Sequence, residues 1–230
     1  MIRNLDQLIE NKQKFHSFVE YYFSHPKFSG PSVYFHEKTI NMIRKSNNFN
    51  DLISSQDFIE CCYATLTSWG MHKMGKKGAK LKDFSSFSKA IHNNISKFVS
   101  LKTYQLKDLN TNDRSRIFSQ IESLFENLDI METDSCLVGN SKLMHHILPD
   151  LVPPIDREHT LMFFFNSKSL LSYDKEKQKF SEILENYWTI CKKIDLQYED
   201  YQKYPQFTSS IPKLIDNAII GYIMKNNADA

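Results

Sequence analysis

The chain has 230 residues and a mass of 27.1 kDa, and 41% of its residues are hydrophobic, which is enough to bury a sizeable core. Only 6 residues are glycine and 7 are proline, a composition that favours helices over many short strands and turns. The formal net charge is +2, so attraction to nucleic acid would have to come from local lysine clusters. We therefore predict an all-α protein.

Cysteine usage and hydropathy predict an intracellular location. The four cysteines have no CxxC pair or other ligand spacing, which argues against a zinc or iron–sulfur site (Cys61, Cys62, Cys136 and Cys191). With no signal peptide, we interpret them as buried, reduced thiols. No apolar run approaches the length of a membrane span, so we expect a cytoplasmic protein without membrane contact.

Apolar residues recur at helical spacing along most of the chain. We expect helices over residues 4–23, from Ser32 to the asparagine-rich segment 45–50, from Ser55 or Asp57 to Trp69, over 84–101, over 114–128 behind the cap Thr111-Asn112-Asp113, from 172 or 174 to 194, and over 210–224. The helix that ends at Trp69 is the most apolar of the first half, and we expect it to be a core helix.

We expect these helices to form one α-helical domain over residues 1–230. Two interleaved helical lobes could compose it, with a cleft near residues 69–82 and 134–160. A monomer is the favoured oligomeric state.

The segment 69–82 combines half of the glycines with five lysines, Lys73, Lys76, Lys77, Lys80 and Lys82. Backbone amides and ammonium groups of such a loop can converge on phosphates, and Trp69 could press on a base or sugar. Alternatively, it is a solvated loop that Trp69 anchors to the core. The Walker pattern is absent.

The segment 134–165 concentrates the turn formers and polar residues of the second half. We expect Gly139 to form a tight turn whose free N–H groups, at a helix start, favour an anion. Lys142 follows in the first turns of that helix, where partial burial would lower the pKa of its amine. Asp156 follows Pro153-Pro154 and starts the next helix.

The same segment resembles the helix-hairpin-helix DNA glycosylase superfamily, the endonuclease III-like fold. In that family a V-G-x-x-K segment begins a helix and a later P-[VI]-D opens another, as Val138 to Lys142 and Pro154-Ile155-Asp156 do here. The archaeal 8-oxoguanine glycosylase branch is also similar, with a late L-D-x-x-[IL] helix echoed by Leu214 to Ile219. Ser135-Cys136-Leu137 replaces the family's usual Leu-Pro-Gly.

This resemblance implies a helix-hairpin-helix architecture and a base-excision glycosylase and lyase that acts on damaged or modified bases in DNA without a cofactor. Lys142 would attack the sugar and Asp156 would stabilise the developing cation. DNA contacts would come from Gly139, Asn140, Ser141, Lys73, Lys76, Lys77, Lys80 and Arg157, and the pocket wall from Trp69, His145 and His146.

Other interpretations stay open at this point. Lys142 could be a surface lysine, Asp156 a plain helix cap, and Arg157 a partner of Glu158 or Asp150. A metal site of His145 or His146 with Asp150, Asp156 and His159 would lack any known ligand spacing. The rival functions are a nucleic-acid-binding module without chemistry and a helical protein of unknown role.

Overall fold

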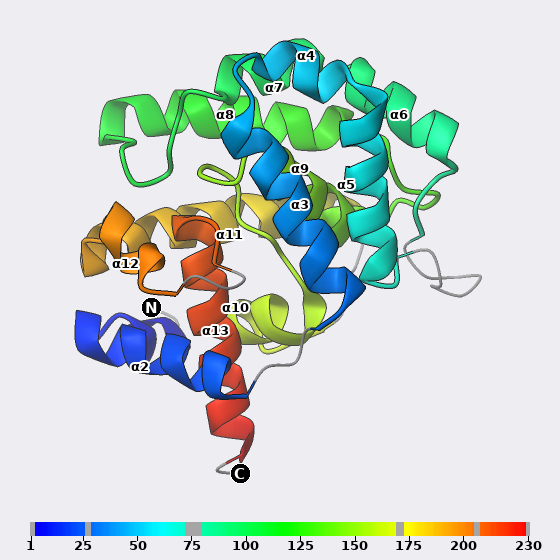
Figure 1. Ribbon diagram of the computed structural model, residues 1–230. Coiled ribbons are helices and arrows are strands. Elements are labelled where there is room, and N and C mark those ends of the chain that lie inside the picture. The colour runs from blue at the N-terminus through cyan, green and yellow to red at the C-terminus, as the bar shows by residue number, and fades with distance from the viewer. Residues whose placement is uncertain (1–2, 26–28, 72–79, 169–172, 205–207, 229–230) are drawn as a thin grey trace.

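The computed structural model describes residues 3–25, 29–71, 80–168, 173–204 and 208–228 (Figure 1). Within these ranges the chain forms thirteen α-helices and one π-helical turn, η1. The only β pairing there is an isolated bridge between Leu81 and Met131. The all-α prediction is therefore confirmed. None of the described helices is long and apolar enough to cross a membrane.

The first half of the chain contains more and shorter helices than its periodicity predicts. The elements are α1 (Arg3–Leu8), α2 (Lys12–Ser24), α3 (Pro31–Lys45), α4 (Phe49–Ser54) and α5 (Gln56–Ser68). The predicted helix 4–23 is interrupted because the Asn11 side chain accepts a hydrogen bond from Lys14 N at 2.8 Å and so caps a new helix.

Cap residues explain the other boundaries. The prediction that Ser32 caps α3 is wrong, because Gly30, with φ of 63°, is the N-cap and Pro31 occupies the first turn. The asparagine-rich segment ends α3 and also starts α4, since Asn48 Oδ1 accepts from Asp51 N. Ser55 caps α5, as one of the two predicted starts.

The remaining elements are α6 (Phe84–His92), α7 (Ile95–Leu101), α8 (Thr111–Asn127), α9 (Leu137–Ile147), η1 (Arg157–Leu161), α10 (Met162–Phe165), α11 (Tyr173–Ile194), α12 (Tyr198–Gln202) and α13 (Ile211–Ala228). The predicted helix 84–101 is broken at Asn94. Its side-chain amide donates to the carbonyls of Ala90 and Asn127, and this fixes the bend between α6 and α7 against the end of α8.

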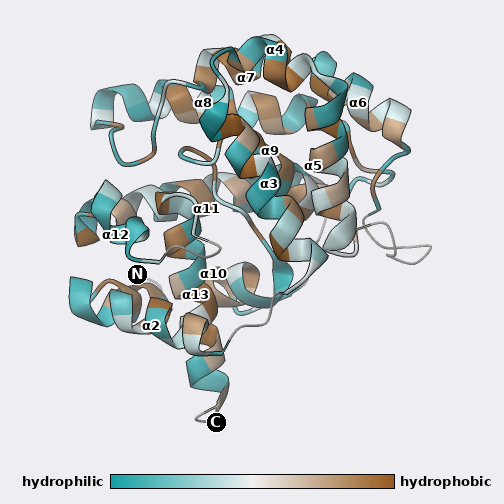
Figure 2. Cartoon of the chain, viewed as in Figure 1, coloured by the Kyte–Doolittle hydropathy of each residue, from teal (hydrophilic) through white to brown (hydrophobic). Residues whose placement is uncertain are grey.

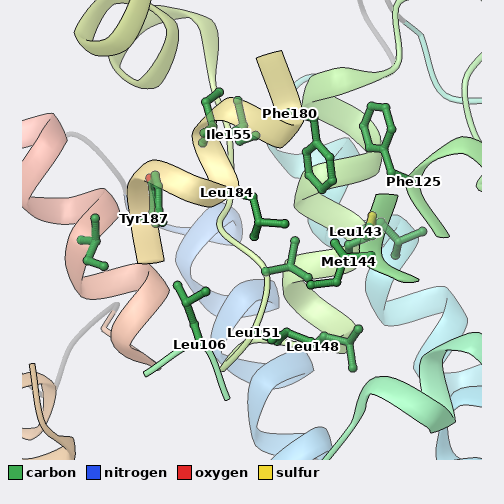
Figure 3. Packing of buried hydrophobic residues seen from close by; sticks show 14 of the residues in the cluster. Leu106, Phe125, Leu143, Met144, Leu148, Leu151, Ile155, Phe180, Leu184 and Tyr187 are labelled. Carbon is green, nitrogen blue, oxygen red and sulfur yellow. The ribbon is translucent and has the colours of Figure 1, made fainter. Parts of the chain in front are cut away.

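Helix α9 lies inside the hydrophobic core, packed against α3, α5, α8 and α11 (Figure 1). Its side chains Leu143 and Met144 lie among Leu184, Phe180 and other apolar residues (Figure 3). The outer helices instead alternate between hydrophilic and hydrophobic residues along their length (Figure 2). Ten of the eleven residues of α9 are fully buried, and the eleventh, Lys142, is partly buried. All four cysteines are buried and free, as predicted.

Helices α2 and α13 approach each other at backbone distance. A Cβ atom added to Gly221 would lie 1.9 Å from the carbonyl oxygen of Phe18. Tyr222, the next residue of α13, reaches α1, where its hydroxyl donates to Asn4 Oδ1 at 3.1 Å and contacts the Gln7 side chain. Glycine at position 221 therefore sets the separation of the two helices.

We expect Gly221→Ala to lower the free energy of unfolding by about 3 kcal/mol or more, because backbone atoms of α2 cannot move aside as a side chain can. Denaturant unfolding would measure this. Asn227→Ala, at an exposed position of the same helix, should change stability by no more than about 0.5 kcal/mol. Equal effects from both variants would contradict the close-contact explanation.

A buried carboxylate connects α2 to α12. Asp200 is 3% exposed, and its oxygens lie 2.6 Å from Lys12 Nζ and 3.2 Å from His16 Nε2. It also accepts from Gln197 N at 2.9 Å. Burial alone would raise the pKa of Asp200, but these donors and the Lys12 and Lys203 ammonium groups outweigh burial and lower it to about 2.

This shift makes stability depend on acid pH. An unfolded Asp has a pKa of about 3.9, so unfolding between about pH 4 and pH 2 takes up a proton that native Asp200 does not bind. The stabilisation is complete above pH 4 and is lost as the pH falls, by up to about 1.4 kcal/mol per pH unit. Asp200→Asn should therefore make the free energy of unfolding depend less steeply on pH between about pH 4 and pH 2. An unchanged slope would refute the assignment to Asp200.

Candidate functional site

Lys142 projects from the buried helix α9 into a small pocket lined by apolar and charged side chains. Its amine makes no hydrogen bond or ion pair to any residue that the structure describes. Its Nζ instead lies 4.7 Å from the centroid of the Trp69 ring, a cation–π geometry. Trp69, at the C-terminal end of α5, is held in turn by a hydrogen bond of 3.2 Å from its Nε1 to the Ser32 carbonyl.

Asp156 reaches the same pocket from the N-terminus of η1. Its Oδ1 accepts from His159 N at 2.7 Å and from Thr160 N at 3.4 Å, so the interpretation of Asp156 as a helix cap is confirmed. Oδ2 lies 3.1 Å from His159 Nδ1. Pro153 and Pro154, both buried, restrict the backbone that leads to this position.

The pocket has a volume of about 30 Å³, room for about two water molecules. It is lined by Trp69, Lys142, Pro154, Ile155, Asp156, Lys213, Asp216 and Ile220. Lys142 and Asp156 therefore share one cavity with Trp69 on its wall, as expected. Their roles in chemistry stay a prediction.

Lys142 and Asp156 differ in how the pocket shifts their pKa values. Burial lowers the pKa of Lys142, while the charges of Asp156 and Asp216 partly oppose this effect. Burial alone would raise the pKa of Asp156, but the hydrogen bonds from His159 and the nearby positive charges outweigh burial and hold it well below its usual range. The site thus combines an amine of lowered pKa with a carboxylate that stays ionised.

Sequence reasoning missed Lys213 and Asp216, on α13, as pocket residues. Both are 4% exposed, and Lys213 Nζ lies 2.6 Å from Asp216 Oδ2. Burial raises the pKa of Asp216, and the Lys213 charge opposes the rise. The sequence did contain a signal for this pair. A Lys and an Asp stand three positions apart in a largely apolar part of the helix, and buried charges are rare unless they are paired.

His145 and His146 are buried behind Trp69 and do not line the pocket, so their predicted place on its wall is wrong. Both are side chains of the core helix α9, and hydrogen bonds fix the orientation of each ring. His146 Nδ1 donates to the Lys142 carbonyl at 2.7 Å, and His145 Nδ1 donates to the Val152 carbonyl at 2.8 Å. Burial lowers the pKa of His146 to about 4, and it lowers the pKa of His145 well below the usual range.

The predicted glycine turn at Gly139 is wrong. Gly139 lies inside α9, where a Cβ would come within 2.3 Å of Met131 Sδ, so its role there is close packing. The N-terminus of α9 is already occupied by an anion of the protein itself. Glu176 Oε2 accepts from Cys136 N at 2.8 Å and from Leu137 N at 2.7 Å, so these amides are not available to a phosphate.

Asn140 and Ser141 are also buried and bonded within the protein. Asn140 Nδ2 donates to the Phe125 carbonyl at 3.0 Å, and Ser141 Oγ accepts from Ile155 N at 3.3 Å. As the chain is folded here, neither can contact DNA phosphate. Ser141 instead joins α9 to the segment that leads to Asp156.

The structure describes only part of the basic segment 69–82. Lys73, Lys76 and Lys77 lie outside the described residues, while Lys80 Nζ lies 3.4 Å from Glu132 Oε1. Arg157 Nη2 donates to Ser135 Oγ at 3.4 Å. The partners suggested for Arg157 are taken by others, because Asp150 binds Arg44 and Glu158 binds Lys168.

No group of three or more His, Cys, Asp or Glu side chains among the described residues is arranged to hold a metal ion. Comparisons of the chain with known protein families, with characterised protein sequences and with solved structures found no match.

We expect the pKa of Lys142 to lie below the ordinary value of a lysine, because its amine is desolvated. NMR titration of the ¹³C-dimethylated protein would resolve it. Asp156→Asn should lower the pKa of Lys142 further, because it removes a negative charge that favours the ammonium form. A pKa of Lys142 at the ordinary lysine value would contradict this account.

Proposed function

We propose that the protein is a DNA base-excision glycosylase and lyase, with Lys142 as the nucleophile and Asp156 as the assisting carboxylate. One observation carries the proposal: an amine of lowered pKa and a carboxylate that stays ionised, from two different elements, line one small pocket beside Trp69. The order of Val138, Gly139, Lys142 and Asp156 in the sequence supports the same family, with a helix-hairpin-helix architecture as part of the proposal.

The first step needs a neutral amine. Burial favours neutral Lys142, whose nitrogen lone pair forms a bond to C1′ of the nucleotide as the glycosidic bond breaks. The departing base keeps the electron pair of the broken glycosidic bond and is then protonated. Asp156 lies where its negative charge can stabilise the positive charge that develops on the sugar. The hydrogen bonds from His159 fix the position of this carboxylate.

The second step uses the same bond. Loss of a proton from the attached nitrogen and opening of the sugar ring give a Schiff base between Lys142 and C1′. Elimination of a C2′ proton then breaks the C3′–O bond and cuts the strand. At about 30 Å³ the pocket has room for reacting atoms but not for a nucleobase. The base would have to lie outside this pocket.

Borohydride reduction traps the Schiff base, so it tests the proposal directly. We expect a covalent adduct between the protein and at least one duplex from a panel that carries oxidised, alkylated or deaminated bases or an abasic site. Lys142→Gln should abolish the adduct while DNA binding persists, because Gln keeps much of the stem and lacks the amine. Lys38→Gln, at an exposed lysine outside the pocket, should trap normally.

Asp156→Asn separates catalysis from helix capping. An Asn can still accept from His159 N and Thr160 N, so the cap persists and the variant should remain folded, which denaturant unfolding would check. Base release should nevertheless slow by about a hundredfold or more, since the stabilising charge is gone. Unimpaired turnover of this variant, or an adduct that survives in Lys142→Gln, would refute the mechanism and leave a nucleic-acid-binding protein without chemistry.

A further inference from the structure

Asp216 is the second carboxylate of the Lys142 pocket, and the mechanism above gives it no role. It lies on α13, is 4% exposed, and lines the pocket together with Lys142 and Asp156. Its negative charge, like that of Asp156, favours the ammonium form of Lys142. The pocket therefore holds two carboxylates near one amine, and the two differ in their hydrogen bonds.

Both oxygens of Asp156 already accept from donors. Oδ1 accepts from the amides of His159 and Thr160, and Oδ2 lies 3.1 Å from His159 Nδ1. A proton placed on this carboxylate would displace one of these donors. Although burial opposes them, the donors hold the pKa of Asp156 well below its usual range. Asp156 is therefore a poor proton acceptor.

Asp216 has one oxygen that is still available. Lys213 Nζ donates to its Oδ2 at 2.6 Å and so fixes the carboxylate. Oδ1 has no hydrogen-bond partner among the residues that the structure describes, and it remains accessible to water. Burial raises the pKa of Asp216, and the Lys213 charge opposes the rise. Oδ1 can therefore take up a proton without loss of a hydrogen bond to any described residue.

The pocket connects Lys142 to Asp216 without a direct ion pair between them. Its volume of about 30 Å³ leaves room for one water molecule to bridge the amine and the carboxylate. Burial lowers the pKa of Lys142 and raises that of Asp216, so both groups are shifted toward their neutral forms. These opposite shifts reduce the free energy of proton transfer from the ammonium to the carboxylate.

We propose that Asp216 is the proton acceptor for Lys142, and that Lys213 positions its carboxylate. The proposal rests on the proposed function for its place in the reaction, since Lys142 must lose a proton before it attacks. In this step the Lys142 ammonium and the Asp216 carboxylate become a neutral amine and a carboxylic acid. The nitrogen keeps the electron pair of the broken N–H bond. Asp216 later returns the proton to water, and Asp156 stays ionised throughout.

The reaction of Lys142 with formaldehyde tests this role without DNA. The neutral amine adds to the aldehyde carbon, loss of water gives an imine, and hydride from cyanoborohydride reduces it to a methylated lysine that peptide mass spectrometry quantifies. We expect Asp216→Asn to slow methylation of Lys142 at pH 7 by about a hundredfold, as loss of a positioned base does. A purely electrostatic role predicts the opposite sign, because loss of the negative charge would lower the pKa of Lys142 and speed the reaction.

Two further variants control for folding and for position. Asp150→Asn is the matched control, because Asp150 pairs with Arg44 outside the Lys142 pocket, and it should change the rate at Lys142 by less than about twofold. If Asp216→Asn does not fold, Lys213→Met combined with Asp216→Leu removes both charges, a replacement that often preserves stability. The two lost charges act on the pKa of Lys142 in opposite directions, so this double variant should still be slowed about a hundredfold.

Chemical rescue distinguishes a proton acceptor from a structural residue. Asp216→Ala leaves room for a small carboxylate, so formate should restore part of the rate at Lys142 and should not affect Asp150→Asn. An unchanged or faster rate without the Asp216 carboxylate, an equal loss in Asp150→Asn, or a loss that formate does not restore would overturn the proposal, even if DNA forms a borohydride adduct. A loss that formate restores would support it even if no duplex forms an adduct, and in that case only the glycosylase mechanism fails.

Discussion

The contact between the Glu176 carboxylate and the first amides of α9 is the interaction on which the site depends. A helix that starts inside the core leaves N–H groups that water cannot reach, and each would be costly if unpaired. Glu176, 1% exposed and on the first turn of α11, accepts from two of these amides and from Ser135 Oγ. This carboxylate allows α9 to be buried almost completely and still carry one amine at a fixed position.

Burial of α9 accounts for the chemistry that we assign to Lys142. A lysine on an exposed helix would keep its proton and move freely, whereas Lys142 is partly buried on α9 and faces an aromatic ring and three charged side chains. Lys213 and Asp216 neutralise each other. Asp156 is therefore the carboxylate that balances the charge of Lys142, without a direct ion pair. The same apolar surroundings that hold the helix therefore set the protonation of the amine.

Local patterns in the sequence were sufficient for the fold class and for part of the site. The spacing of apolar residues located most helices, and the lead-in of two prolines placed Asp156 correctly as a cap. The prediction at Gly139 failed because the anion at that helix start is Glu176, about forty residues away along the chain, and no local pattern announces it. Lys213 and Asp216 were missed for a similar reason, since their charges matter only because α13 is buried.

The close contact of α2 with α13 constrains the order in which the chain can fold. Phe18 on α2 and Gly221 on α13 lie near opposite ends of the sequence, so the apolar face of α2 lacks its partner until α13 has been synthesised. Contacts between such distant segments form late, because a long loop must close before they stabilise anything. Since Lys213 and Asp216 belong to α13, the pocket around Lys142 is completed only at this last stage, and a nascent chain would carry the core helix before it carried a site.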